Sequence, residues 1–123
     1  MKFLLSIVLF VFISACDTRY MASIENRSEK DIFISKSDDI TNSYKIAPKS
    51  TRIINWNYSC QLVGVDFKKQ YLNTSDSSKR YISHKRGENV SFYVYFENDT
   101  FFIKDKNEMH GPRIQEVESC KST

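Results

Sequence analysis

The chain has 123 residues, with 18 Lys and Arg residues against 15 Asp and Glu residues and a formal net charge of +3. This length fits one domain and excludes a multidomain protein. Hydrophobic residues make up 41% of the chain, which contains only three Gly and two Pro residues, so the composition is neither disordered nor collagen-like. We therefore expect one folded domain.

The N-terminal segment has the order of a secretory signal peptide. Lys2 is followed by an apolar stretch of eleven residues, 3–13, interrupted only by Ser6. A helix that spans a bilayer needs about 20 apolar residues, so this stretch predicts a signal-peptide core and not a permanent transmembrane anchor. The alternative is a buried N-terminal strand or helix of the folded domain.

The segment ends in Ile13-Ser14-Ala15-Cys16, which resembles the lipobox of bacterial lipoproteins. The resemblance implies transfer of a diacylglyceryl group to the Cys16 sulfur and cleavage of the chain before Cys16. Two or three acyl chains hold a protein stably at a membrane, whereas one chain holds it only marginally. The predicted parts of the chain are a cleaved signal peptide over residues 1–15, a lipidated tether over 16–19 and a single domain over 20–123.

The predicted location is the bacterial cell envelope, with the domain facing the periplasm and held at the membrane through the lipid on Cys16. Asp17 follows this cysteine directly. Its position resembles the signal that retains enterobacterial lipoproteins in the inner membrane. The resemblance therefore favours the inner over the outer membrane.

The two remaining cysteines are Cys60 and Cys120, an even pair that predicts one disulfide in an oxidising compartment. The bond would close a loop of about 60 residues, for which chain entropy gives roughly 4 kcal/mol of stabilisation. The alternative is a redox or metal site, but the sequence has no C-x-x-C motif and only His84 and His110 as imidazole donors. We predict no metal site and no cofactor.

Downstream of the tether, apolar and polar side chains alternate, which predicts β-strands. Residues 20–25 and 31–35 alternate on either side of a polar turn, so we expect a β-hairpin there. Its inward side chains would be Ala22, Ile24, Ile32 and Ile34. Further strands are expected at residues 44–46, 51–56, 58–67 and 80–84.

The strongest hairpin pattern covers residues 90–96 and 100–103, where aromatic and β-branched residues fill both strands and Asn98-Asp99 lies in the turn. We expect this pair to form the central strands of the core. After Gly111-Pro112, residues 113–119 fit either one turn of helix or an edge strand. About seven to eight short strands predict an all-β fold, a small antiparallel β-sandwich or a small barrel, and we favour the sandwich.

Motifs with a catalytic or nucleotide-binding mechanism are missing from the sequence, which has no G-x-x-x-x-G-K, G-x-G-x-x-G, H-E-x-x-H, G-x-S-x-G or S-x-x-K pattern. Asp38 and Asp39 are adjacent carboxylates, but neighbouring side chains on a strand point to opposite faces, so a solvated loop is the better interpretation. His84 fits a half-exposed histidine better than a catalytic base. We predict that the protein is not an enzyme, with a small periplasmic hydrolase or redox enzyme as the alternative.

Charge is segregated along the second half of the chain. Residues 68–86 have a net charge of +5, and residues 88–108 have a net charge of −3. The candidate binding surface consists of Lys68, Lys69, Lys79, Arg80, Lys85 and Arg86. Outside the cytoplasm this surface would face anionic lipid head groups or an acidic protein, and not nucleic acid.

The alternative interpretation of the basic segment is a solvated loop and sheet edge that discourages pairing with other sheets. In that case the functional surface would lie on the aromatic hairpin. Its members would be the exposed residues among Phe92, Tyr93, Tyr95 and Phe101.

A second resemblance involves Trp56-Asn57-Tyr58-Ser59-Cys60, the aromatic hairpin and Cys120. These segments are similar to parts of the membrane-bound inhibitors of c-type lysozyme, which are small lipoproteins with one disulfide. The sequence lacks their Ser-Gly loop and has about forty residues between the lipobox and Cys60, so the resemblance concerns only the class of protein.

We predict a lipid-anchored, non-catalytic module that binds a protein partner in the envelope, such as an immunity or inhibitor protein. The alternative is a structural or assembly accessory of an envelope complex. Both interpretations place the protein at the membrane through the lipid on Cys16, with a protein as its partner and no small-molecule cofactor.

Overall fold

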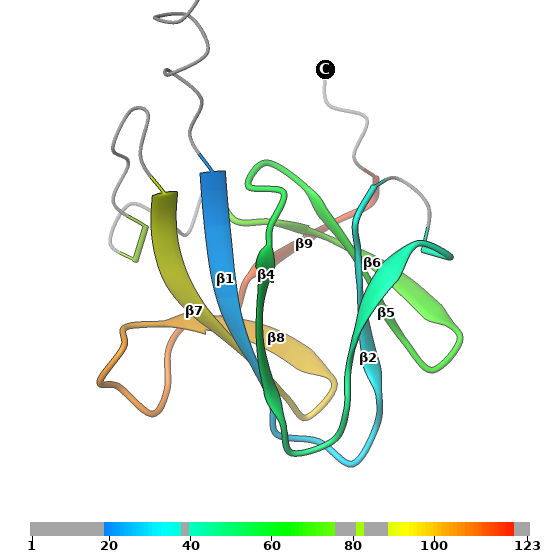
Figure 1. Cartoon of the computed structure of the whole chain (residues 1–123), viewed down its shortest axis with the longest axis horizontal. Helices are drawn as coiled ribbons and strands as arrows, with labels where there is room; N and C mark the ends of the chain where they lie inside the picture. Colours follow the sequence, from blue (N-terminus) through cyan, green and yellow to red (C-terminus); the bar gives the residue numbers. More distant parts are fainter. Residues whose placement is uncertain (1–18, 38–39, 76–80, 83–88, 120–123) are drawn as a thin grey trace, which may run out of the picture.

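The computed structural model describes residues 19–37, 40–75, 81–82 and 89–119, which form nine strands in two sheets (Figure 1). The strands are β1 (Arg19–Asn26), β2 (Ile32–Ser35), β3 (Ser43–Ile46), β4 (Thr51–Asn55), β5 (Gln61–Val65), β6 (Lys68–Asn73), β7 (Asn89–Glu97), β8 (Thr100–Lys104) and β9 (Gln115–Val117). The described residues contain no apolar helix of membrane-spanning length. The expected all-β fold class is confirmed, although the strand count of seven to eight is too low.

The first sheet has four strands in the order β4-β1-β7-β8. β1 pairs antiparallel with β4 and parallel with β7, which places Ile24 beside Arg52 on one side and Val94 on the other. The expectation of a purely antiparallel fold is therefore wrong. A parallel pair needs a long crossover, and here the crossover contains β4 of the same sheet together with β2, β3, β5 and β6 of the second sheet.

The expected hairpin between residues 20–25 and 31–35 is also wrong, because β1 and β2 lie in different sheets. The expected inward side chains are nevertheless fully buried: Ala22, Ile24, Ile32 and Ile34 are each 0% exposed. Alternation determines which face of a strand is buried, but it does not determine which strand lies alongside. The chain crosses between the sheets in the turn that follows Asn26.

The second sheet has five antiparallel strands in the order β3-β2-β5-β6-β9. Every residue of β5, the central strand of this sheet, is buried. At Gly64 the Ile40 side chain covers the strand, and an added Cβ would lie 3.2 Å from Ile40 Cδ1. The expected strand over residues 58–67 is shorter than predicted. It ends at Val65, and a tight turn at residues 66–67 leads into β6.

The core lies between the two sheets and is rich in aromatic side chains. Phe92 meets the ring of Trp56 edge-on, with the ring centroids 5.9 Å apart. Phe96 packs against Phe101 at 4.7 Å, across the turn of the β7–β8 hairpin. The expected hairpin is thus confirmed. The expectation that both of its strands are central holds for β7 but not for β8, which lies at the end of the strand order.

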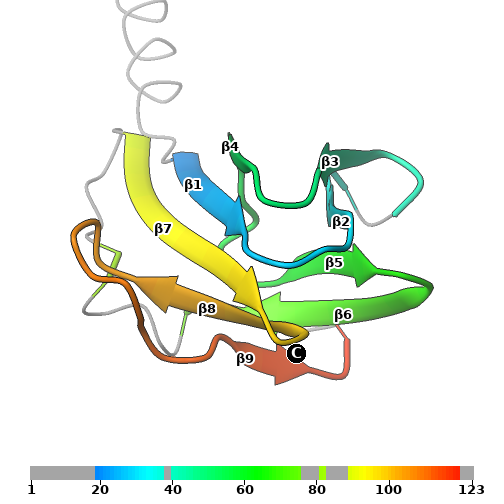
Figure 2. The same ribbon diagram turned by 90° about the horizontal axis from the view of Figure 1, so that it is seen from below.

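The two sheets are joined along one side of the domain. The segment after Gly111 pairs with β8, where Ile103 N donates to Pro112 O and Ile114 N donates to Phe101 O, both at 2.9 Å. The chain then continues into β9 beside β6, so of the two options for residues 113–119 the edge strand is correct. On the opposite side, β3 and β4 are the end strands of the two sheets; they form no backbone ladder with each other, and the turn at residues 47–50 connects them (Figure 2).

Candidate functional site

Four turns meet at the end of the domain where β1 terminates (Figure 1). They span residues 27–31, 47–50, 66–67 and 98–99, and we call them together the loop end. Side-chain contacts link all four turns to one another. The Lys49 ammonium group lies 3.3 Å from Glu29 and donates to Arg27 O at 2.7 Å, which ties the second turn to the first.

Asn26 is the buried polar residue that organises this end, with 0% of its surface exposed. Its side-chain amide donates to Lys30 O at 2.6 Å, Ile46 O at 3.0 Å and Ala47 O at 3.2 Å. Its side-chain oxygen accepts hydrogen bonds from the backbone N and the hydroxyl of Ser28, at 3.0 and 2.7 Å. Because one side chain satisfies three carbonyl groups from two turns, it fixes where both turns lie.

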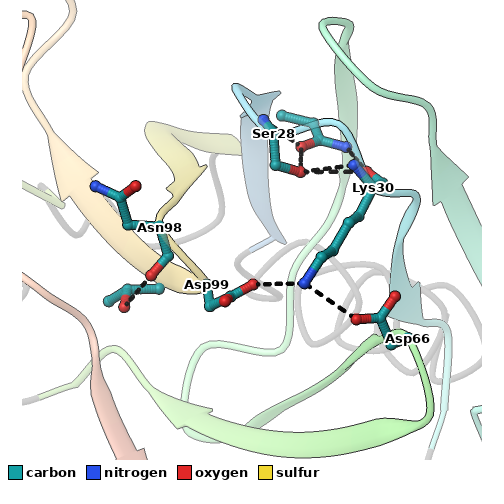
Figure 3. A network of polar contacts seen from close by, with 7 residues as sticks. Ser28, Lys30, Asp66, Asn98 and Asp99 are labelled. Atoms are coloured by element: carbon teal, nitrogen blue, oxygen red, sulfur yellow. Dashed lines mark hydrogen bonds and ion pairs between the residues drawn. The ribbon is translucent and has the colours of Figure 1, made fainter.

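Lys30 connects the remaining turns. Its Nζ lies 3.1 Å from Asp66 Oδ2 and 3.1 Å from Asp99 Oδ1 (Figure 3). These two carboxylates come from the β5–β6 and β7–β8 turns. All three side chains are partly exposed, so water screens the ion pairs and they orient the turns more than they stabilise the fold.

The hydrogen bonds to Asp66 and then to Asp99 raise the pKa of Lys30 above its usual value of 10.5. A raised folded-state pKa means that the ion pairs contribute fully below the unfolded-state pKa, and that the contribution is lost only as pH rises through the folded-state pKa. The network is therefore intact at neutral and mildly alkaline pH.

Backbone conformation makes the turns tight. Asp66, Asn98 and Asp99 have φ values of 57°, 52° and 59°, and Lys49 has a φ of 58°. Asn and Asp tolerate this left-handed region better than other residues with a Cβ atom. Two successive positive φ values at Asn98 and Asp99 are typical of the type I′ turn that suits a two-residue hairpin.

The most exposed large apolar side chain of the loop end is Phe67, which is fully exposed at the tip of the β5–β6 turn. It follows Asp66, whose carboxylate is held by Lys30, and it precedes Lys68 and Lys69, which are both exposed on β6. The loop end therefore presents an exposed aromatic side chain, Phe67, between charged residues. The turn that carries it is held by the ion pair of Asp66 with Lys30. At protein interfaces, a few anchor residues that fill pockets of the partner, often aromatic, contribute most of the binding energy.

The structure brings only part of the predicted basic surface to this place. Lys68 and Lys69 adjoin Phe67, whereas Lys79, Arg80, Lys85 and Arg86 lie outside the described residues. Phe67 was not predicted as a surface residue, because the apolar run that precedes it suggested that the strand continues. The turn could have been found from Asp66, which interrupts the apolar run and favours a left-handed conformation.

The alternative surface on the aromatic hairpin is mostly inside the domain. Phe92, Tyr95 and Phe101 are buried, and Tyr93 is half-buried beneath the Lys104 ammonium group, 5.6 Å from its ring centroid. Of this set only Tyr93 is available at the surface.

The cysteine and histidine predictions fall largely outside the described residues, which do not include Cys16, Cys120 or His84. Cys60 lies between β4 and β5 and lines a cavity of about 540 Å³. Within the described ranges, no group of three or more His, Cys, Asp and Glu side chains could hold a metal ion.

Comparison with known proteins adds no relative to this picture: no protein-family model, no curated protein and no solved structure matches the chain. The arrangement of the loop end, with fixed turns, an exposed aromatic ring and surrounding charges, has the chemistry of a binding surface for another macromolecule.

Proposed function

We propose that this protein is a lipid-anchored, non-catalytic binding module of the bacterial cell envelope, built as a small β-sandwich, and that it binds a protein partner through its loop end. An immunity or inhibitor protein is the kind of molecule that would act in this way. The observation that carries the proposal is the fully exposed Phe67 on a turn held by the Lys30 ion pairs.

The direction of β1 supports this assignment. Cys16 lies three residues before Arg19, where β1 begins, and the loop end follows directly after Asn26, where β1 ends. A strand of eight residues is roughly 26 Å long at about 3.3 Å per residue. A lipid on Cys16 would therefore hold one end of the domain near the membrane and direct the loop end away from it, toward a partner.

The partner surface is tested by photo-crosslinking in the membranes of the source cells, with a photoreactive amino acid placed at Phe67 of the full chain. The control position is Met109, another exposed apolar residue, 71% exposed, in the segment after β8. We expect a discrete crosslinked protein from position 67 and none from position 109. Once that protein is purified, Phe67→Ala should weaken its binding about 30-fold, the effect of losing an interface residue worth about 2 kcal/mol.

Equal crosslinking from both positions, or unchanged affinity of the Phe67→Ala variant, would show that the loop end is not the binding surface. The identity of the crosslinked protein separates the two envelope roles. A toxin or hydrolase favours an immunity or inhibitor protein, and a component of an assembly complex favours an accessory.

The lipid anchor is tested separately through Cys16. The variant Cys16→Ser lacks the thiol that would accept the diacylglyceryl group, so we expect it to lose incorporation of labelled palmitate and to leave the detergent-soluble membrane fraction. The wild-type chain should incorporate the label. Incorporation into the variant, or a wild-type chain that fractionates without the membrane, would contradict the proposed anchor.

A disulfide between Cys60 and Cys120 is part of the proposal. Its support is the position of Ser119, the residue directly before Cys120, which lines the same cavity as Cys60. We expect both thiols to resist alkylation until a reductant is added, and Cys60→Ala to lower the free energy of unfolding by about 2–4 kcal/mol. Two alkylated cysteines in the native exported protein would exclude the bond.

A further inference from the structure

The outer edge of β4 has unused backbone hydrogen-bonding groups. Trp56 N donates to Tyr20 O, and Asn26 N donates to Ser50 O, so the even-numbered residues of this segment face β1. Groups of successive residues point to opposite sides of a strand. The N–H and C=O groups of Thr51, Ile53 and Asn55 therefore point away from β1, and no backbone partner for them occurs among the described residues.

The side chains along this edge are unusually exposed for a strand. Thr51, Ile53 and Asn55 are all exposed. Ile53 is apolar, and 66% of its surface is accessible. Proteins commonly protect a free edge with charged side chains, proline or a bulge. β4 has no proline, and its one charged residue, Arg52, lies over the Tyr44 ring of β3. Beside it, Ile53 presents an apolar side chain to solvent at the centre of the strand.

β3 is the end strand of the second sheet on the same side of the domain as β4, and we call the region between β3 and β4 the opening. Lys36 N donates to Asn42 O. In the register of β2 and β3 the backbone groups of the even-numbered residues of β3 therefore point toward β2. The backbone groups of Ser43 and Lys45 point the other way, toward the opening. Among the described residues the Arg52 side chain reaches across it: the guanidinium group donates to Lys45 O at 3.1 Å and lies over the Tyr44 ring of β3. Figure 2 shows β3 and β4 apart on this side of the domain.

Two cations, Arg52 and Lys36, lie beside the opening and have no carboxylate partner among the described residues. The Arg52 guanidinium carbon lies 5.0 Å from the centroid of the Tyr44 ring, and Lys36 Nζ lies 4.8 Å from it. Among residues 19–37, 40–75, 81–82 and 89–119, no Asp or Glu forms an ion pair with either cation. Two exposed positive charges on one ring favour an anionic ligand.

The cavity of about 540 Å³ continues this edge beyond the end of β4. Asn55 and Trp56 line it from the β4 side, Lys36 from the β2 side, and Leu62 from β5. A chain that runs along β4 past Asn55 would reach this cavity and could place a side chain in it. Main-chain pairing together with a side-chain pocket is the usual basis of strand addition.

We propose that β4 is a docking edge for an extended, acidic segment of a partner protein, which adds as a fifth strand to the first sheet. The backbone groups of Thr51, Ile53 and Asn55 pair with the segment, and its carboxylates meet Arg52 and Lys36. Thr51 follows the 47–50 turn of the loop end directly, but the groups that pair with the segment do not include Phe67, so the inference holds or fails independently of Phe67.

The test uses two synthetic peptides and the purified full chain in detergent solution, with Cys60 and Cys120 retained. The acidic peptide is Thr-Val-Glu-Val-Glu-Val-Thr with blocked termini, and the matched basic peptide has Lys in place of Glu. We expect saturable binding of the acidic peptide with a Kd below about 1 mM, at least about tenfold tighter than the basic peptide, and weaker binding as salt rises. Amide hydrogen exchange of Ile53 and Asn55 should slow in the complex.

Ile53→Pro is the decisive variant, because proline removes an N–H that β1 does not use and fits an edge strand. We expect it to weaken binding about tenfold or more, whereas Ile53→Val, which keeps the N–H, should bind like the wild type. Circular dichroism and thermal melting establish that both variants fold. Lys36→Gln should weaken the binding of the acidic peptide. Lys106→Gln, which changes an exposed lysine elsewhere on the domain, should leave that binding unchanged.

Three results would overturn the proposal. They are no saturable binding of the acidic peptide at millimolar concentration, equal binding by the Ile53→Pro and Ile53→Val variants, and equal affinity for the acidic and basic peptides. Sedimentation of the protein without peptide tests whether a second copy of this chain occupies the edge instead. A dimer that Ile53→Pro dissociates would assign the edge to a second copy of this chain and also exclude the proposed partner.

Discussion

Gly111→Ala is expected to destabilise the domain by about 3 kcal/mol or more, at the upper end of the usual effect of overpacking. A Cβ atom at this position would lie 1.8 Å from Ile103 O and 2.8 Å from Ile103 C, which no side-chain rotation can relieve. The backbone would have to move away from β8. The hydrogen bond from Ile103 N to Pro112 O and the contact of Gly111 N with the Tyr95 hydroxyl would be lost with it.

Thermal melting measures this effect. For a domain of this size a loss of 3 kcal/mol lowers Tm by roughly 12 °C or more. The matched control is Gly64→Ala, where the added Cβ meets the Ile40 side chain at 3.2–3.3 Å and the nearest backbone atom, Lys68 O, only at 3.8 Å; we expect a change below about 1 kcal/mol. Similar Tm values for the Gly111→Ala and Gly64→Ala variants would mean that the segment after Gly111 does not approach β8 as closely as described.

Asn26→Ala is the second substitution with a large expected effect. It removes the donor group shared by the carbonyls of Lys30, Ile46 and Ala47. A buried polar group left without a partner costs about 1–3 kcal/mol, and the bond to Ile46 O is buried. We therefore expect the free energy of unfolding to fall by about 2–4 kcal/mol, with faster amide hydrogen exchange in residues 27–31.

Asn107→Ala provides the control for Asn26→Ala, since Asn107 is exposed in the segment after β8 and a surface substitution of this kind stays within about 0.5 kcal/mol. Unfolding in denaturant should separate the two variants clearly. If Asn26→Ala were as stable as Asn107→Ala, the loop end would not depend on this side chain for its conformation.

The sequence predicted best what is local. The β7–β8 hairpin follows from the alternation of aromatic and β-branched residues around Asn98-Asp99, and the positive φ values of both turn residues explain why this pair suits the reversal. The burial of Ala22 and Ile24 also follows from alternation, because a period of two residues states which side chains share a face.

The neighbours of β1 could not be predicted in the same way. Alternation in residues 20–25 fits an antiparallel partner next in the chain as well as a parallel partner far away, and the choice between β2 and β7 depends on how the whole core packs. β6 was missed for a related reason. Its first residues, Lys68 and Lys69, are exposed, so the strand begins with a charged pattern that is also typical of a loop.

In the candidate site, too, local features were predictable from the sequence and long-range contacts were not. Lys68 and Lys69 are exposed as expected for a basic surface, since charged side chains rarely lie inside a domain. The ion pair between Lys30 and Asp99 joins residues 69 positions apart, and no local pattern predicts such a contact. Exposure of Phe67 depends on a turn formed by one residue with a positive φ, for which Asp66 was the only local signal.

The parallel pairing of β1 with β7 determines when the domain can fold. Paired residues such as Ile24 and Val94 are 70 positions apart, and entropy opposes closing so long a loop before other contacts form. β1 is synthesised before the other described strands. It can pair with both of its neighbours, β4 and β7, only after most of the chain has been made. Folding should be slow for a domain of this size, in the millisecond-to-second range of proteins with many non-local contacts.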